Sequence, residues 1–491
     1  MQVIQRAPCR KKVFFLKLRN RVFMKGKVKK RVLEESVLFI SVIKWFFLAS
    51  FVGILVGFST SIFLRGLEGG ISLLGQFKYY FFLLPLALFL SSILTKYLSP
   101  DAEGHGTEKV IKAVHKNSGK ISPLVVPVKL AATIITIAAG GSAGKEGPCA
   151  QIGAGIASIF SGLMKFSKKD RQKLVICGIS AGFATVFGTP IAGAIFGVEV
   201  LSVGILLYDI LLPSIIAGMV GYQVALLLGV TYFHQPLNFI PPFSSPLFIM
   251  VCISGIFFGL CSFFFIELQK YISTRSKKLN IWQPYKAAIG GVILIILALL
   301  FSTKFLGLGL ETIKESLEGN KLNSLMFLGK MIFTSVTLSF GGSGGIVTPI
   351  FFIGAASGNA FASFPGLDLA MFSAIGMVAL LAGAANTPIA AIIMAAELFG
   401  PGVAPFAAVA CIISFLMTGH RSVYPSQILS ITKSSTITLE KGKEMEGLGS
   451  MQITPRQRSL TSVIIKVTDK IIKSSEKLKK KFEDKDKQQK Q

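Results

Sequence analysis

A duplicated pattern of glycines and prolines constrains the fold of this chain more than any other feature of its sequence. Residues 141–153, GSAGKEGPCAQIG, align with residues 342–354, GSGGIVTPIFFIG, at a constant spacing of 201 residues. Pro148 falls on Pro349 at that spacing, with a serine and glycines aligned around each of them. A match of this kind at one spacing indicates two copies of one structural unit.

A second pair of segments extends the repeat. Residues 180–201 align with residues 381–399, and after a gap of three residues Glu199 falls on Glu397. Internal repeats of this length are typical of transporters, whose two halves pack around a shared site. We therefore predict two homologous halves, about 38–232 and 246–431. Their relative orientation does not follow from the match.

The composition places both halves in a membrane. Hydrophobic residues make up 52% of the chain and charged residues 15%, with a mean hydropathy of +0.64, whereas soluble proteins carry about 25% charged residues. We therefore expect an all-α polytopic membrane protein. Spans are predicted from Leu38–Leu64 and from ten further apolar runs: 79–98, 122–140, 149–164, 204–232, 246–266, 287–302, 324–340, 349–364, 369–399 and 403–418. Several of these are short or interrupted by Gly and Pro, which favours helices that line a transport route.

Much of the net charge of +28 lies outside the apolar region. Residues 1–37 carry 12 Lys and Arg against 2 acids, and residues 432–491 carry 15 against 8. Basic segments next to membrane spans stay in the cytoplasm, so we predict cytoplasmic tails on either side of a transmembrane domain at 38–431. The first tail alternates basic and apolar residues, which is typical of a helix at the lipid surface. This distribution argues against nucleic acid as a partner.

Motifs for metal-dependent chemistry are missing from the sequence. It contains no HExxH or CxxC pattern, and its four histidines lack the spacing of metal ligands. We therefore predict no enzyme activity, no metal and no cofactor. A cation-coupled solute transporter is the alternative from another class, although the apolar region is poor in the acidic ligands that such proteins use for the ion.

The repeated glycine-rich segments predict an anion site. Glycines permit tight turns, and proline suits the first turn of a helix, so each segment resembles a loop that leads into a helix at Pro148 or Pro349. The N-terminus of a helix presents free N–H groups and a partial positive charge, which attract anions. Glu146 lies in the first loop, where a carboxylate would compete with a bound anion and give way on protonation. The alternative is an ordinary ion pair between Lys145 and Glu146.

The same motifs resemble those of the CLC family of chloride channels and chloride/proton antiporters. The segment GKEGP at 144–148 is similar to the family motif G[K/R]EGP, and GIVTP at 345–349 is similar to GxFxP. GHGTE at 104–108 resembles the first family motif, GSGxP, and GHRSVYPSQ at 419–427 resembles the segment that brings a tyrosine to the inner anion site. The resemblance covers about 38–431. It implies an inverted, two-fold pseudosymmetric helical fold and a homodimer with one pathway in each subunit.

The resemblance also implies roles for individual residues. Glu146 would be the gating glutamate and proton acceptor, and the Tyr424 hydroxyl would donate to the anion. The chain departs from the family pattern in having His105 for Ser, Glu108 for Pro and Val347 for Phe. The anion-binding positions carried over are His105, Gly106, Gly144, Lys145, Gly147, Gly345, Ile346, Val347 and Tyr424.

Channel and antiporter remain open as alternatives. Antiporters of this family often carry an internal proton-accepting glutamate where this chain has Val200, next to Glu199. This favours a chloride channel gated by Glu146. A chloride/proton antiporter is the alternative, in which His105 or water relays the proton. Tyr424 favours chloride over fluoride, because fluoride-selective relatives usually lack that tyrosine. We expect the inner membrane of a prokaryote as the location.

Overall fold

The computed structural model describes residues 9–454, apart from 233–235, 238–241, 243, 365 and 450–451. For residues 9–29 it describes the backbone only. The first eight residues and those from 455 onward, which include most of the predicted C-terminal tail, lie outside the described residues.

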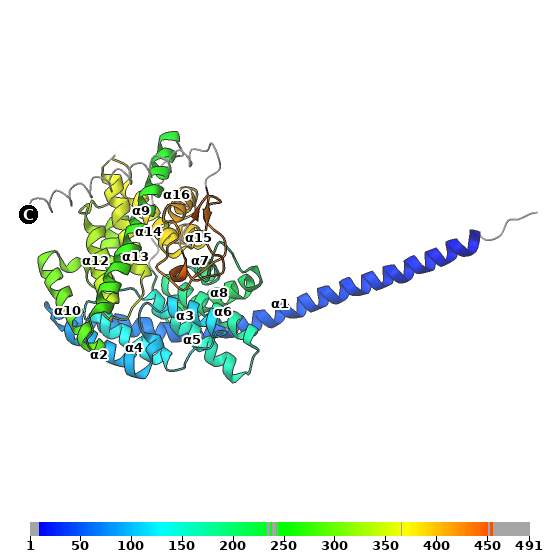
Figure 1. The fold of residues 1–491 in the computed structure, drawn as a ribbon, viewed down its shortest axis with the longest axis horizontal. Helices are drawn as coiled ribbons and strands as arrows, with labels where there is room; N and C mark the ends of the chain where they lie inside the picture. The colour runs from blue at the N-terminus through cyan, green and yellow to red at the C-terminus, as the bar shows by residue number, and fades with distance from the viewer. Residues whose placement is uncertain are drawn as a thin grey trace, which may run out of the picture.

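Sixteen α-helices form most of the described chain (Figure 1). The first eight are α1 (Cys9–Gly75), α2 (Leu84–Ile93), α3 (Thr107–Lys116), α4 (Val125–Ala138), α5 (Glu146–Leu163), α6 (Lys168–Phe187), α7 (Pro190–Glu199) and α8 (Tyr208–Leu227). The second eight are α9 (Ser245–Lys278), α10 (Gln283–Leu300), α11 (Leu310–Leu317), α12 (Met326–Ser339), α13 (Val347–Ser363), α14 (Leu369–Ala385), α15 (Pro388–Phe399) and α16 (Ala404–Met417).

Only short elements lie between and after these helices. They are the single turns Tyr80–Leu83, Leu94–Leu98, Pro100–Ala102, Thr303–Phe305 and Met445–Gly447, and the two-residue strands β1 (Ser202–Val203), β2 (Ile428–Leu429), β3 (Ile437–Thr438) and β4 (Gln452–Ile453). Strands β1 and β2 pair in parallel and β3 and β4 pair antiparallel. The β1–β2 pair ties the segment after α16 to the end of α7.

The second eight helices repeat the packing of the first eight in the same order. Helix α5 packs along α6 as α13 packs along α14, and α8 packs on α1 as α16 packs on α9. Equivalent helices meet where the halves join, namely α2 with α10 and α7 with α15. At the centre, Gly144 and Gly345 form an antiparallel bridge. The predicted all-α, two-fold pseudosymmetric fold with an inverted repeat is confirmed.

Helix α1 differs from what the sequence predicted. The basic N-terminal segment does not form a separate helix, because α1 continues without a break from Cys9 to Gly75. Figure 1 shows its N-terminal part projecting far beyond the helical body. From Cys9 to residue 68 the sequence has no proline and no pair of adjacent glycines, so nothing in it ends the helix earlier.

Five helical segments of the described residues are long and apolar enough to cross a membrane. They are Lys30–Gly75, Tyr80–Leu98, Tyr208–Leu227, Ser245–Lys278 and Gln283–Leu300. The other apolar helices are shorter, which agrees with the interrupted runs in the sequence. Such helices are tolerated at membrane depth when they are buried in protein.

The predicted runs need two corrections, one run that is divided and one helix that was missed. The run predicted at 369–399 is two helices, because Asn386 adopts a left-handed conformation with φ of 56° and Pro388 starts a new helix. Helix α6 was missed, since its first turns read KKDRQK and lower the hydropathy of the whole segment. Gly188, with φ of 71°, ends α6 just before Pro190, as Asn386 does before Pro388. The break is therefore part of the repeat.

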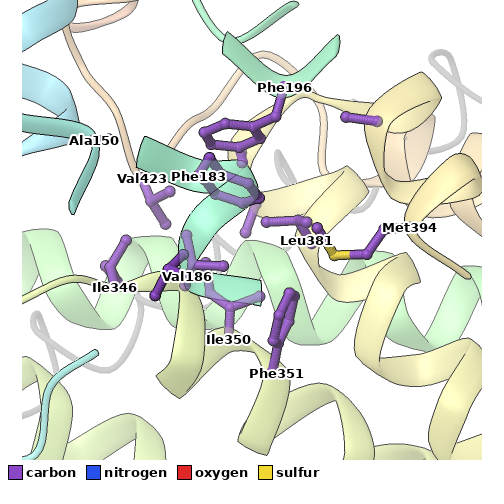
Figure 2. Close-up of a cluster of buried hydrophobic side chains, with 14 of the residues drawn as sticks. Ala150, Phe183, Val186, Phe196, Ile346, Ile350, Phe351, Leu381, Met394 and Val423 are labelled. Carbon is purple, nitrogen blue, oxygen red and sulfur yellow. The ribbon is translucent and has the colours of Figure 1, made fainter. Parts of the chain in front are cut away.

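One hydrophobic core joins the two halves. Figure 2 shows Phe183 and Phe196 of the first half close to Leu381 and Met394 of the second. The rings of Phe183 and Phe196 stack at 3.8 Å between centroids. Ile346, just before α13, lies beside this cluster (Figure 2), so the core supports the starts of the central helices.

Candidate functional site

The two glycine-rich loops predicted from the repeat meet at the centre of the molecule. The N–H of Gly144 donates to the carbonyl of Gly345 at 2.7 Å, and the N–H of Gly345 donates back at 2.6 Å. The flanking serines are held in the same reciprocal way: the N–H of Ser142 donates to the Thr337 hydroxyl at 3.1 Å, and that of Ser343 to Thr136 at 3.2 Å. These bonds fix the starts of α5 and α13 next to each other.

The side chain of Glu146 binds at the N-terminus of α13. It is completely buried, and its Oε2 accepts the N–H of Thr348 at 3.0 Å. The Thr348 hydroxyl donates to its Oε1. A carboxylate here stands in for an anion, because the first N–H groups of a helix have no partner within the helix. The Glu146 carboxylate therefore occupies a position at the start of α13 where an anion could bind. Among the ion pairs of the described residues there is none between Lys145 and Glu146.

The loop before α3 packs directly on the start of α5. Gly106 has φ of 75°, and a Cβ there would lie 2.6 Å from the Gly147 carbonyl oxygen. A Cβ on Gly147 would in turn lie 2.0 Å from the carbonyl oxygen of His105. Glycine is therefore required at both positions. The backbone of the predicted first motif is thereby brought against the gate.

The side chain of His105, whose carbonyl makes this contact, lies next to Tyr424. Tyr424 is completely buried, and its hydroxyl makes no hydrogen bond of ordinary geometry with the described protein. The rings of His105 and Tyr424 lie 6.1 Å apart, tilted by 58°. His105 Nδ1 is also buried without a hydrogen-bond partner. Buried polar atoms without partners are uncommon and point to a ligand or water.

Gln427 holds the Tyr424 loop in place. Its amide nitrogen donates to the carbonyls of Val200 and Ala385, at 2.8 Å each. Its amide oxygen accepts from Asn386 at 3.0 Å and from Ser422 at 2.6 Å. This buried amide therefore uses all of its hydrogen-bonding capacity. It connects the end of α7, the break between α14 and α15, and the loop that carries Tyr424.

Two buried lysines, also related by the repeat, fix the loops before α3 and α11. Lys129 of α4 donates to the carbonyls of Ala102, at 3.1 Å, and Gly104. Lys330 of α12 donates to the carbonyls of Phe305 at 3.1 Å and Gly307 at 2.8 Å. Lys129 therefore anchors the loop that presents His105, and Lys330 anchors the equivalent loop in the other half.

Glu199 and Val200 do not reach the cluster around Glu146 through any contact in the described residues. The carboxylate of Glu199 accepts from the N–H groups of Ile389 and Ala390 at the start of α15. Val200 is buried, and its carbonyl accepts from Gln427. The described residues contain no group of three or more His, Cys, Asp or Glu that could hold a metal ion.

The structure brings most of the predicted anion-site residues together, with changes in detail. The N–H groups of Gly144 and Gly345 bond to each other rather than facing a ligand. Thr348 and Gln427 were missed by the sequence reasoning. Thr348 could have been found from its position, since the repeat aligns it with Gly147, immediately after the gate.

Comparisons with known proteins agree with this geometry. The family model for the voltage gated chloride channel matches residues 87–419. A chloride/fluoride channel protein from Pseudomonas syringae pv. tomato is 36% identical over 82% of this chain and 90% of its own length. A voltage-gated ClC-type chloride channel, ClcB, from Escherichia coli is 28% identical over 60% of this chain and 74% of its own.

Solved structures show the same fold. A CLC-type fluoride/proton antiporter superposes with a TM-score of 0.75 at 28% identity, covering 79% of this chain and 98% of that one. A slow cyanobacterial Cl−/H+ antiporter gives a TM-score of 0.68 at 22% identity, covering 76% and 94%.

Proposed function

This chain belongs to the voltage-gated chloride channel (CLC) family, and from that premise we propose that it moves halide ions across a membrane in exchange for protons, with Glu146 as gate and proton carrier. The observation that carries the proposal is the Glu146 carboxylate, which is buried and held by the N–H and hydroxyl of Thr348. An anion that enters this position must displace the carboxylate, and protonation of the carboxylate releases it.

The rest of the route follows from the groups around the gate. The N-termini of α5 and α13 supply partial positive charge, and the Tyr424 hydroxyl is available as a donor on the other side of Gly147. No full countercharge is bonded to this position within the described residues, so bound anions would be held weakly enough to leave again.

A passive channel is the second candidate, and one observation favours it. Val200 stands where a second proton acceptor is often found, and the neighbouring Glu199 is engaged at the start of α15. Exchange is favoured because the solved relative with 28% identity is a fluoride/proton antiporter. The Pseudomonas syringae relative and the solved fluoride/proton antiporter both carry fluoride in their names, so fluoride is tested beside chloride.

The test is a flux assay on the purified protein in lipid vesicles. A chloride or fluoride gradient is imposed while potassium and valinomycin clamp the voltage near zero, and the pH inside the vesicles is followed. Uphill proton movement driven by the halide gradient, and lost in Glu146→Gln while halide flux continues, supports exchange. Halide flux without proton movement in the wild type supports the channel. Absence of halide flux rejects both.

We further propose a homodimer in a prokaryotic plasma membrane, with both ends of the chain in the cytoplasm. The family resemblance and the basic residues at both ends support this arrangement. A single cysteine introduced at Lys441 should react with an impermeant maleimide only after the cells are opened. Labelling in intact cells would show that the C-terminal tail lies outside the cell, contrary to the proposed topology.

A further inference from the structure

Two buried polar atoms without a hydrogen bond of ordinary geometry lie on the neighbouring rings of His105 and Tyr424. They are Nδ1 of His105 and the hydroxyl of Tyr424, on rings whose centroids are 6.1 Å apart. The His105 side chain is 13% exposed, so most of it is withdrawn from solvent. A ligand or water beside the two rings would satisfy both atoms, whereas no described protein group makes a hydrogen bond of ordinary geometry to either, the Thr107 side chain lying near that of Tyr424.

The opposite edge of the His105 ring faces a carboxylate that reaches water. Nε2 lies 3.6 Å from Oε2 of Glu108, whose side chain is 29% exposed. The other Glu108 oxygen, Oε1, lies 3.4 Å from the hydroxyl of Ser426. His105 therefore stands between a carboxylate in contact with solvent and the buried space beside Tyr424.

The chemistry of imidazole links a proton to an anion in this position. A neutral imidazole has one N–H, and when that N–H points to Glu108, Nδ1 offers only a lone pair. A lone pair repels an anion. Protonation turns Nδ1 into a donor and adds a positive charge, so that halide and proton bind together. Release of the Nε2 proton to Glu108 would then complete a proton transfer across the ring.

We propose that His105 and Glu108 form a proton-binding pair whose protonation is linked to halide occupancy of the space beside Tyr424. The proposal rests on the anion route proposed above and names a second proton site on it, distinct from Glu146. The charged groups around the ring act in both directions. Burial has the largest effect and lowers the pKa of His105, whereas Glu108 favours the protonated ring, and Lys129 of α4 and Lys109 of α3 oppose it. The ammonium of Lys129 is bonded to the carbonyls of Ala102 and Gly104, the second of which is next to His105.

The test measures proton uptake when halide binds to the full-length protein in detergent. Sodium chloride is added to weakly buffered samples of Glu146→Gln, a background in which the gate no longer titrates. Calorimetry on the same samples measures chloride binding. We expect Glu146→Gln to take up a fraction of a proton per subunit in a range that begins below about pH 6.5, because burial lowers the pKa of His105 in the absence of halide. Adding His105→Gln should lower this uptake by at least about fivefold.

Two further variants separate linkage from misfolding. His115→Gln, in the Glu146→Gln background, alters a histidine of α3 that bonds to the Leu201 carbonyl, and its proton uptake should match the background. Glu108→Gln keeps the imidazole but removes the charge that favours its protonated form. The uptake should then move to a pH lower by roughly half a unit to one unit.

The outcomes distinguish the two proposals. Chloride binding to Glu146→Gln without proton uptake overturns the His105–Glu108 pair alone, and so does uptake that survives His105→Gln. Loss of chloride binding in both Glu146→Gln and the wild type overturns the proposed function together with the pair. Proton uptake that is lost in His105→Gln and moves to lower pH in Glu108→Gln supports the pair. This also holds if the wild type conducts halide without moving protons.

Discussion

Glu199 and Glu397 cap each other's helices across the pseudo-two-fold axis. Glu199, the last residue of α7, accepts from the first-turn N–H groups of α15 at 3.1 and 2.8 Å. Glu397 of α15 accepts from the first-turn N–H groups of α7 at 3.0 and 2.9 Å. Carboxylates in this position complement the helix dipole. The carboxylate of Glu199 therefore forms part of the contact between the two halves of the molecule.

Glu199→Gln and Glu397→Gln should therefore behave alike. Each replaces a charge-assisted pair of hydrogen bonds by a neutral one, which we expect to lower stability by about 1–2 kcal/mol. Unfolding in mixed micelles measures the change. The number of protons moved per halide should be the same as in the wild type for both variants.

The contrast between the two variants provides the control. If Glu199→Gln stops proton movement while Glu397→Gln does not, Glu199 is a proton carrier in addition to a cap. Equal losses of stability with unchanged coupling would assign both residues to the interface between the halves.

Thr348→Val should shift the pH dependence of transport to higher pH. The Thr348 hydroxyl donates to Glu146, which stabilises the ionised carboxylate, and valine removes that donor at similar volume. The protonated, open gate is then populated at higher pH. A hydrogen bond to a charged group contributes about 1.5–3 kcal/mol, and 1.36 kcal/mol corresponds to one pH unit, so the midpoint should rise by about one unit or more. Halide flux measured from pH 4.5 to 8 gives the midpoint.

Thr348→Ser is the matched control. It keeps the hydroxyl and the backbone N–H, so its midpoint should stay within about 0.3 unit of the wild type. A Val variant with the midpoint of the wild type would show that the hydroxyl does not set the gate.

The repeat predicted the two halves and the meeting of their glycine-rich loops, while the composition and the family resemblance predicted the all-α, inverted fold. The role of Glu146 as a gate stays a prediction. Glycines and prolines at fixed spacing indicate tight turns and helix starts. These features depend on the local backbone, so they can be recognised in a single sequence. The break at Asn386 was not predicted, although an asparagine followed two residues later by Pro388 is a helix-end signal and falls on Gly188 in the repeat. Here its amide bonds to Gln427 and to the Arg421 carbonyl.

Contacts between distant segments account for the rest of what the sequence left undetermined. Gln427 holds the Tyr424 loop through groups that lie up to 227 residues away in the chain. No spacing rule relates such positions, because they are brought together only by tertiary packing. The reciprocal bonds of Glu199 and Glu397 are of the same kind, although the repeat had already paired these two residues.

Tyr424→Phe should weaken halide binding without loss of stability. The hydroxyl is buried and makes no hydrogen bond of ordinary geometry, although the Thr107 side chain lies near it, so its removal breaks no well-formed hydrogen bond in the folded protein. Phenylalanine keeps the ring that packs beside His105. We expect the dissociation constant for chloride to rise by roughly fivefold to tenfold, from the loss of about one hydrogen bond. Calorimetry on Glu146→Gln with and without Tyr424→Phe measures it. Unchanged affinity and halide selectivity would remove Tyr424 from the site, and Tyr424→Ala should show a larger effect.

Lys129→Met and Lys330→Met should have similar effects on stability and different effects on transport. Each lysine is buried and donates to two loop carbonyls. Methionine has no N–H group and cannot replace these hydrogen bonds. The two losses of stability should agree within about 1 kcal/mol, since each variant removes a similar set of hydrogen bonds. The loop held by Lys129 carries His105 and packs on Gly147, whereas the loop held by Lys330 leads into α11 and makes no contact with the gate in the described residues. Lys129→Met should therefore change halide affinity and its pH dependence, with Lys330→Met close to the wild type in both. Equal effects of the two variants on affinity would mean that the loop before α3 contributes nothing specific to the anion route.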